Sequence, residues 1–439
     1  METSALLKHH FRNAQNSSPD ARVRSLLRTW RRRFPSFNAV NYAQLAKLLA
    51  RASPGGGAAL EGGTHRVLRD FLAALHGLLA ADLDFFRGCR LGGLLNDLSL
   101  LGALPRSVCE AVDERAEDLV PAMHVGDIGL LASAFGRCGY PARRFFECLE
   151  RRHADWLPDD PEEEKDRITA KAVAGVLHGY LAHRYRPPAV LGWLNYNSHW
   201  FVREAARRNK PGQLVQAVTF LATVGDDHAG ISADTNSVMR RVHNKVPWML
   251  EVLDFHSKVD LCWALALSRR IPSGESNVGL VWSVLVQDLR EEAEKYSTED
   301  APLRSFLLSP GPAEQERAAL SLVRLAHVLL VNDIETFYLE KPPNWLILAA
   351  KQANVVSENR ARAERDESER LGIEVVPERQ FCVCPATGAQ TIDGIGMMKQ
   401  ALLRRLNYDV AFMTLDEWEE ADDKEMFLRL AILTTKPVL

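Results

Sequence analysis

Residues 184–210 interleave cations with aromatic rings. Cations neutralise phosphates, while rings and guanidinium planes stack on unpaired bases, so this combination is typical of RNA-binding surfaces. If 198–208 is helical, Arg203, Arg207 and Arg208 project within one turn as a ridge. The alternative is that the rings belong to the core and the arginines are merely solvated. The cations are Arg184, Arg186, Arg203, Arg207, Arg208 and Lys210, and the rings are Tyr185, Trp193, Tyr196, His199 and Trp200.

Three further groups of cations extend the prediction of phosphate contact. One lies in the basic N-terminal segment, one would lie a repeat beyond residue 210, and one lies on an expected helix near the C-terminus. They are Arg31, Arg32 and Arg33, then Arg240, Arg241 and Lys245, then Lys399, Arg404 and Arg405.

No pattern in the chain indicates catalysis, a cofactor or a metal. Cys382 and Cys384 have no second Cys or His pair at zinc-ligand spacing nearby. The glycine-rich stretches GIGMM and SPGGGAAL lack the pattern of a phosphate-binding loop. We therefore expect no catalytic residues, no cofactor and no metal site.

Charge is segregated along the chain although the net charge is only −3. Residues 1–53 sum to +8 and residues 167–275 to +6, whereas the short stretch 156–166 sums to −5. Two basic stretches in an otherwise acidic chain predict a localised polyanion footprint, with solvated helix faces as the alternative.

The composition indicates a soluble globular protein. The chain has 439 residues, 46% of them hydrophobic and 25% charged, which suits two or three domains. Seven scattered cysteines favour a reducing compartment over a disulfide framework. No run of eighteen apolar residues occurs, so no membrane insertion is expected.

Residues 1–35 form a basic segment that is rich in Arg and Ser and nearly free of acids. This composition is typical of a mitochondrial or plastid transit peptide. The alternative is a basic helical arm of the mature fold. We favour mitochondrial import, with the plastid as the alternative.

Helical periodicity and a degenerate repeat dominate up to about residue 350. Each copy predicts a helix, a turn near Gly or Pro, and a second helix. One such pair cannot bury its apolar face alone, so residues 36–350 are expected to stack into an α-solenoid; a non-repeating helical domain is the alternative. Copies lie at 94–115, 130–151 and 176–194, with weaker ones at 216–227, 261–272 and 322–333.

The pattern changes after residue 350. A charged linker or helix is expected at 351–370, and a small α/β unit at 371–439. Within that unit we expect strands at 372–376, 380–384 and 408–413, and helices at 397–406 and within 415–432. The expected fold class is therefore mainly α, with a small α/β domain at the end.

Residues 396–432 resemble the closing half of a RAP domain, although Asn407 stands where Gly is usual. The helical repeats at 37–50 and 127–152 also resemble those of RAP-domain relatives, which include octotricopeptide-repeat proteins and the Fas-activated serine/threonine kinase family. The matching C-terminal positions are Lys399, Leu402, Leu403, Arg404, Arg405, Tyr408, Val410, Glu417, Trp418, Phe427 and Leu428.

The resemblance implies organellar RNA metabolism and a C-terminal fold similar to PD-(D/E)XK nucleases. Nucleases of that fold need clustered carboxylates for a divalent metal and a nearby Lys. Asp393, Glu374 and Lys399 are the only candidates, and the segment that usually follows the acidic strand is missing. The domain is therefore expected to be degenerate and without endonuclease activity.

Together these features predict a non-catalytic RNA-binding protein of the mitochondrial matrix. Ribosomal RNA is the favoured ligand, in a mitoribosome or during its assembly, with ribosomal or other ribonucleoprotein proteins as neighbours. The alternatives are a messenger RNA processing or translation factor, and a protein-interaction scaffold that does not contact RNA.

Overall fold

The computed structural model shows a mainly α-helical protein, as expected from the sequence. Helices make up most of the residues that the structure describes. Two compact units are present, Met1–Gln213 with Pro385–Thr387, and Leu214–Cys384 with Gly388–Leu439. The structure describes residues 3–13, 17–33, 37–52, 60, 62–89, 91–164, 167–224, 238, 241–242, 245–267, 370–376, 381–388, 390–392, 408–414 and 420–421.

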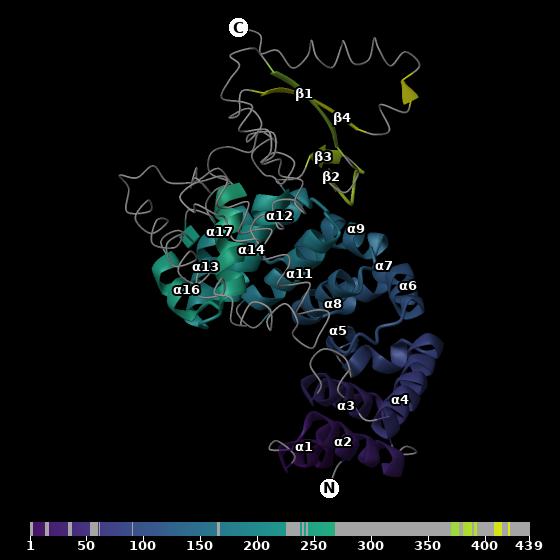
Figure 1. The fold of residues 1–439 in the computed structure, drawn as a ribbon. Coiled ribbons are helices and arrows are strands. Elements are labelled where there is room, and N and C mark those ends of the chain that lie inside the picture. Colours follow the sequence, from purple (N-terminus) through teal and green to yellow (C-terminus); the bar gives the residue numbers. More distant parts are fainter. Residues whose placement is uncertain are drawn as a thin grey trace. The chain divides into compact units, whose positions relative to one another are not determined.

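The first unit is built from helices joined by short turns (Figure 1). Its N-terminal helices already contribute to the core, because Leu7, Leu26 and Leu27 are buried. The helices are α1 (Thr3–Asn13), α2 (Pro19–Arg33), α3 (Ala39–Ala52), α4 (Gly62–Ala81), α5 (Leu91–Leu100), α6 (Arg106–Glu114), α7 (Ala116–Leu119), α8 (Val125–Cys138), α9 (Arg143–Arg151), α10 (His153–Trp156), α11 (Ala170–Ala182), α12 (Pro188–Tyr196) and α13 (Ser198–Arg207), with 3-10 turns at Asp84–Cys89 and Val120–Ala122.

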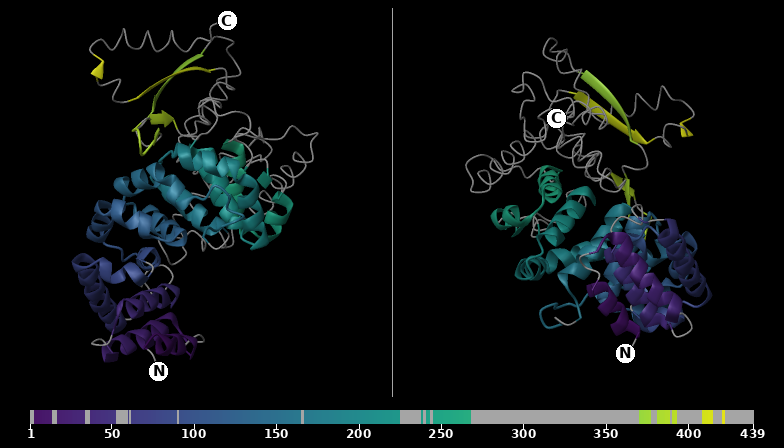
Figure 2. Two further views of the ribbon diagram at one scale, coloured as in Figure 1. Left: turned by 180° about the vertical axis from the view of Figure 1, so that it is seen from behind. Right: turned by 60° about the horizontal axis from the view of Figure 1, so that its bottom comes forward.

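These helices pack in two rows within the first unit. One row runs through α3, α5, α8 and α11, each in contact with the next. The other runs through α4, α6, α9 and α12 in the same way. Figures 1 and 2 show the successive helices of the first row side by side. The helix pairs α5–α6, α8–α9 and α11–α12 coincide with the three strongest predicted repeats.

The turns inside these pairs share one backbone conformation. Gly102, Gly139 and Arg184 all have positive φ, at 63°, 68° and 53°. In the first and third turns the next residue donates its N–H to the carbonyl five positions back, at 2.9 Å, which ends the helix in a Schellman motif. Tyr140 and Tyr185 each directly follow the left-handed residue and therefore occupy equivalent positions in their turns.

A periodic contact also links the helices of the second row. His76, Asp113 and Glu150 lie 37 residues apart on α4, α6 and α9. His76 Nε2 donates to the carbonyl of Ala103, just before α6, at 2.8 Å. Asp113 accepts from the N–H of the third residue of α9 at 2.8 Å, and Glu150 accepts from the second residue of α12 at 2.6 Å. Asp113 and Glu150 thus accept from the first turn of the next helix in the row, whereas His76 donates to the turn that precedes it.

Asp97 on α5 provides a pH-dependent prediction. Burial raises its pKa to about 6, although Lys47, Arg51 and Arg137 oppose the shift. The folded state therefore holds this proton more tightly than the unfolded state, and stability from this group falls as pH rises from about 4 to about 6. We expect Asp97→Asn to raise the melting temperature at pH 7.5 and to have less effect at pH 4.

Thermal unfolding at both pH values checks this expectation. The control is Asp159→Asn, at an exposed position. A variant-minus-wild-type difference that is equal at the two pH values would contradict the assignment.

The second unit combines helices with short strands. The strands expected at 372–376, 380–384 and 408–413 are confirmed as β1 (Arg370–Val376), β2 (Phe381–Val383) and β4 (Tyr408–Thr414), and the structure adds β3 (Gln390–Ile392). β1 pairs in parallel with β4, and β2 pairs antiparallel with β3. The described helices of this part of the chain are α14 (Pro211–Val224, which begins at the unit boundary), α16 (Val246–Val252) and α17 (Phe255–Leu267).

Several expected elements lie outside the described residues. They include the linker at 351–370 apart from its last residue, the repeat at 322–333, the helix at 397–406 and nearly all of 415–432. Among the described helices, none has both the length and the apolar character that a bilayer crossing requires.

Candidate nucleic-acid interface

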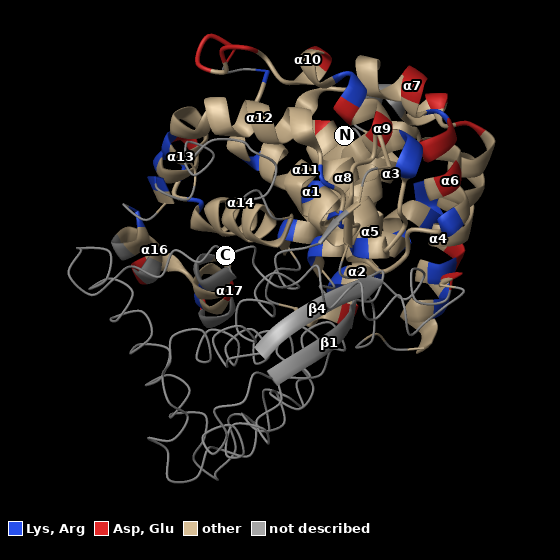
Figure 3. Ribbon diagram, turned by 90° about the horizontal axis from the view of Figure 1, so that it is seen from above, with Lys and Arg blue, Asp and Glu red and all other residues tan. Residues whose placement is uncertain are grey.

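Helix α13 carries the ridge of cations that its sequence predicted. Trp200, Phe201 and Ala205 are buried on one side. Arg203 and Arg207 project into solvent from the other side, followed by Arg208, Asn209 and Lys210, which are also exposed. Because the apolar residues recur at helical spacing, their burial turns the intervening cations outward. Figure 3 shows Lys and Arg gathered on α13.

The aromatic rings of this region fall into two groups. Trp193 and Trp200 belong to the core, with ring centroids 5.9 Å apart and with Trp193 Nε1 donating to the carbonyl of Pro158 at 2.7 Å. Tyr196, by contrast, is 85% exposed at the end of α12, and His199 is exposed on α13. Some of the rings therefore belong to the core and others face solvent. Tyr196 and His199 are the rings that a base can reach.

Tyr196, His199, Arg203 and Arg207 follow each other at spacings of three, four and four residues. We call these four residues the α13 stripe. Residues three and four apart lie on the same face of a helix, and Asn197 forms only a brief break between α12 and α13. His199, Arg203 and Arg207 therefore share one face of α13, and the exposed ring of Tyr196 lies just before them, on the other side of the break at Asn197.

The other three aromatic or basic residues near 184–186 are less accessible. Arg184 is half-buried in the left-handed turn after α11, and Arg186 is only 8% exposed. Tyr185 is half-buried, and its hydroxyl donates to the carbonyl of Pro141 at 3.1 Å. The structure does not place these side chains on the stripe, and Arg186 offers little guanidinium surface to a phosphate.

Carboxylates accompany the cations of α13, which the sequence did not indicate. Glu162, in the acidic stretch after α10, forms an ion pair with Arg203. The hydrogen bond from Arg203 lowers the pKa of Glu162 and raises that of Arg203. Glu204 pairs with both Arg207 and Arg208. A phosphate that binds here must compete with these carboxylates; the acidic loop beyond α10 is visible in Figure 3.

The N-terminal cations lie at the end of α2. Arg31, Arg32 and Arg33 are all exposed in its last turn. Arg31 Nη2 lies 3.7 Å from a carboxylate oxygen of Asp70 on α4, an exposed pair of small energetic weight. This end of α2 is therefore a second accessible basic surface of the first unit.

The remaining predicted site residues belong to the second unit. Arg241 and Lys245 are exposed, whereas Arg240, Lys399, Arg404 and Arg405 lie outside the described residues. Of the three nuclease candidates, Glu374 lies on β1, and Asp393 and Lys399 are outside the described residues. No group of three or more metal-ligating side chains occurs in the part of the chain that the structure describes.

A pair of cysteines was not foreseen from the sequence. Cys109 on α6 is buried, Cys138 at the end of α8 is exposed, and their Sγ atoms lie 3.8 Å apart. The hydrogen bond between the thiols lowers the pKa of Cys138 to about 7 and raises that of Cys109. Cys138 is therefore the thiol of the pair that ionises first. The two residues are 29 positions apart on different helices, so their spacing carried no signal.

No family model matches this chain, and none of the curated proteins matches it in sequence.

Proposed function

We propose that this chain is a non-catalytic RNA-binding protein of the mitochondrion. Its favoured ligand is ribosomal RNA, held within a mitoribosome or during its assembly. The proposal rests chiefly on the α13 stripe, where an exposed tyrosine ring at the end of α12 precedes His199, Arg203 and Arg207 on one face of α13. A ring that stacks on a base beside guanidinium groups that contact phosphates is the arrangement with which proteins hold single-stranded RNA.

The proposed architecture is an α-solenoid of degenerate repeats with a RAP-like domain at its end. The two rows of helices, the shared left-handed turns and the 37-residue spacing of His76, Asp113 and Glu150 support the solenoid. The parallel pair β1–β4 supports an α/β domain, because parallel strands need a crossover connection. The RAP assignment itself depends on the sequence resemblance.

The preference for ribosomal RNA comes from the distribution of charge. Exposed cations occur on several helices, with runs of three at the end of α2 (Arg31–Arg33) and at the end of α13 (Arg207, Arg208 and Lys210), while acidic side chains colour α6, α7 and the loop after α10 (Figure 3). A protein in a ribosomal subunit needs only local basic contacts, and its acidic faces can meet basic neighbours. A free protein that reads RNA sequence would need a longer basic groove.

Removal of the stripe cations Arg203 and Arg207, together with the nearby exposed Lys210, tests RNA binding directly. We expect Arg203→Gln, Arg207→Gln and Lys210→Gln together to weaken binding of single-stranded RNA by about tenfold. The slope of log affinity against log salt should fall by about two, because each lost phosphate contact removes about 0.7. Arg208 is retained so that the buried Glu204 keeps a partner. Fluorescence anisotropy at several salt concentrations measures both quantities.

The matched control removes three other arginines. Arg106, Arg143 and Arg151 are also exposed and paired with glutamates, on α6 and α9. Their replacement by Gln should leave RNA affinity within about twofold. Equal loss in both triple variants would show that only net charge matters and would refute a site on α13. Crosslinking of wild-type protein to RNA in cells would then identify the ligand, and reads in messenger RNA would redirect the proposal.

A protein-interaction scaffold is the second candidate, and one observation favours it. Arg203, Arg207 and Arg208 already have carboxylate partners, so α13 is closer to electrically balanced than its sequence suggests. On this alternative Tyr196 is a contact for a protein partner rather than for a base. Tyr196→Ala would then leave RNA affinity unchanged while weakening co-purification of that partner.

A further inference from the structure

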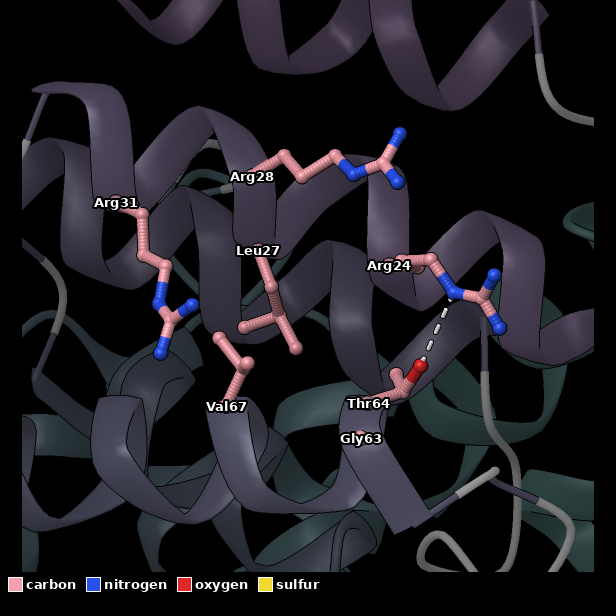
Figure 4. Close-up of a pocket in the computed structure, with 7 residues that line it drawn as sticks. All are labelled: Arg24, Leu27, Arg28, Arg31, Gly63, Thr64 and Val67. Carbon is pink, nitrogen blue, oxygen red and sulfur yellow. Dashed lines mark hydrogen bonds between the residues drawn. The ribbon is translucent and has the colours of Figure 1, made fainter.

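A second basic site lies between α2 and α4 and is distinct from the α13 stripe. Arg24, Leu27, Arg28 and Arg31 recur at spacings of three, one and three residues, which places them on one face of α2. They line a cavity of about 250 Å³ whose opposite wall is the first two turns of α4 (Figure 4). Three arginines therefore contribute to the lining, with Arg31 and Arg24 on either side of Leu27 in Figure 4.

The walls of the cavity combine these charges with an apolar floor. Leu27 is buried, and Val67 of α4 lies across from it in Figure 4. Gly63 and Thr64 contribute the beginning of α4, where backbone N–H groups have no partner within the helix. None of the lining residues is acidic. The lining itself therefore carries positive charge and no negative charge, although Asp20 and Asp70 pair with two of its arginines from outside.

The three arginines are held to different degrees. Arg24 is fixed, since its Nε donates to Thr64 Oγ1 at 3.2 Å and its Nη2 pairs with Asp20. Arg31 has only the distant exposed contact with Asp70. Arg28 is exposed, and no carboxylate of the described residues forms an ion pair with it. Arg28 and Arg31 are thus available to a ligand, whereas Arg24 joins α2 to α4.

We propose that this cavity, the arginine pocket, binds a phosphate group. A guanidinium presents paired N–H donors that match two oxygens of a phosphate, and a helix N-terminus favours the same anion. Asp20 and Asp70 already offset part of the charge of Arg24 and Arg31, but a phosphate offers more acceptor oxygens than a carboxylate to Arg28, Arg31 and the N–H groups of α4, which favours it over an acidic side chain. The phosphate belongs either to an RNA strand or to a small molecule. The inference stands apart from RNA binding, because free phosphate is one of its two probes.

The test uses the full chain, because Arg24, Arg28 and Arg31 all lie within the segment 1–35. Calorimetric titrations use inorganic phosphate and an eight-nucleotide oligouridylate without a terminal phosphate. We expect Arg28→Gln with Arg31→Gln to weaken the binding of at least one probe tenfold or more. Val67→Glu is a second variant, at a half-buried lining position, that places a competing carboxylate against intact arginines and should have the same effect. The control is Arg66→Gln with Arg69→Gln, exposed positions on α4 outside the lining.

The outcomes of these titrations distinguish the two sources of the phosphate, and they separate this proposal from RNA binding at α13. Loss of phosphate binding alone assigns the pocket to a small molecule or free anion. Loss of oligonucleotide binding, with α13 variants unaffected, assigns it to RNA and removes the α13 stripe from the interface. The proposal is overturned if neither probe binds the wild type, or if the pocket variants bind as tightly as the control.

Discussion

Gly175→Ala is expected to destabilise the first unit by about 3 kcal/mol. Within a helix this substitution ordinarily stabilises by up to about 1 kcal/mol, because alanine has the higher helix propensity. Here a Cβ on Gly175 of α11 would lie 2.4 Å from the carbonyl oxygen of Gly129 on α8. Backbone atoms cannot turn aside as a side chain can, so the two helices must separate and lose contacts along their length.

Gly129 occupies the reciprocal position, where a Cβ would lie 2.4 Å from the carbonyl oxygen of Ala172. Once one added methyl has separated α8 from α11, a second at the same interface costs less. We therefore expect Gly129→Ala with Gly175→Ala to lower the unfolding free energy by less than the sum of the single variants. Urea unfolding followed by circular dichroism measures all three.

The control is the same substitution at an open position. Gly77 lies within α4, and a Cβ there would meet no atom within 4 Å. Gly77→Ala should leave stability unchanged or raise it. If Gly175→Ala destabilised the protein no more than Gly77→Ala does, the close approach of α8 and α11 would be refuted.

The helix pairs and the strands could be predicted because their signals are local. Gly102 and Gly139 with the prolines that follow mark the turns, and alternating residues mark β1 and β4. The third turn shows the limit, because Arg184 adopts there the left-handed conformation that glycine adopts in the first two. That turn was located by alignment with its neighbours rather than by its own residue type.

Only part of the candidate site could be predicted from the sequence, because burial depends on how neighbouring helices pack. The spacing of cations and rings gives the outward face of α13, but not which rings the neighbouring helices cover. Trp193 and Trp200 are buried while Tyr196 is exposed, although in the sequence all three are aromatic residues placed among cations in the same way. Likewise Glu162 is 41 positions from Arg203, so their ion pair depends on how the acidic loop folds back.

Substitution of Glu150 is expected to have the second large effect on stability. Its carboxylate is needed as a hydrogen-bond acceptor, whereas burial disfavours the negative charge of the carboxylate. Its Oε1 accepts from the N–H of Ala189 at 2.6 Å at the start of α12, and the side chain is 6% exposed. Burial raises the pKa of Glu150, although the N–H groups of Ala189 and Val190 oppose the shift. Glu150→Met removes the acceptor and leaves donors unsatisfied, at an expected cost of about 2 kcal/mol.

Glu150→Gln separates the two roles of this side chain. The amide keeps an oxygen acceptor and carries no charge, so its unfolding free energy should lie within about 0.5 kcal/mol of wild type near the unfolded pKa. With a folded pKa above the unfolded one, stability from Glu150 is lost as pH rises, so the Gln variant should gain relative to wild type at higher pH. Denaturant unfolding of both proteins at pH 5 and pH 8 measures this difference in unfolding free energy.

Asp113 extends the argument from one residue to the repeat. It lies 37 positions before Glu150, accepts from the start of α9, and has its pKa raised by burial as well. If the helices of the second row are equivalent units, Asp113→Asn and Asp113→Leu should reproduce the signs seen for Glu150→Gln and Glu150→Met. Opposite signs at the two positions would mean that the shared spacing is coincidental, and the case for a repeating architecture would lose its most specific side-chain evidence.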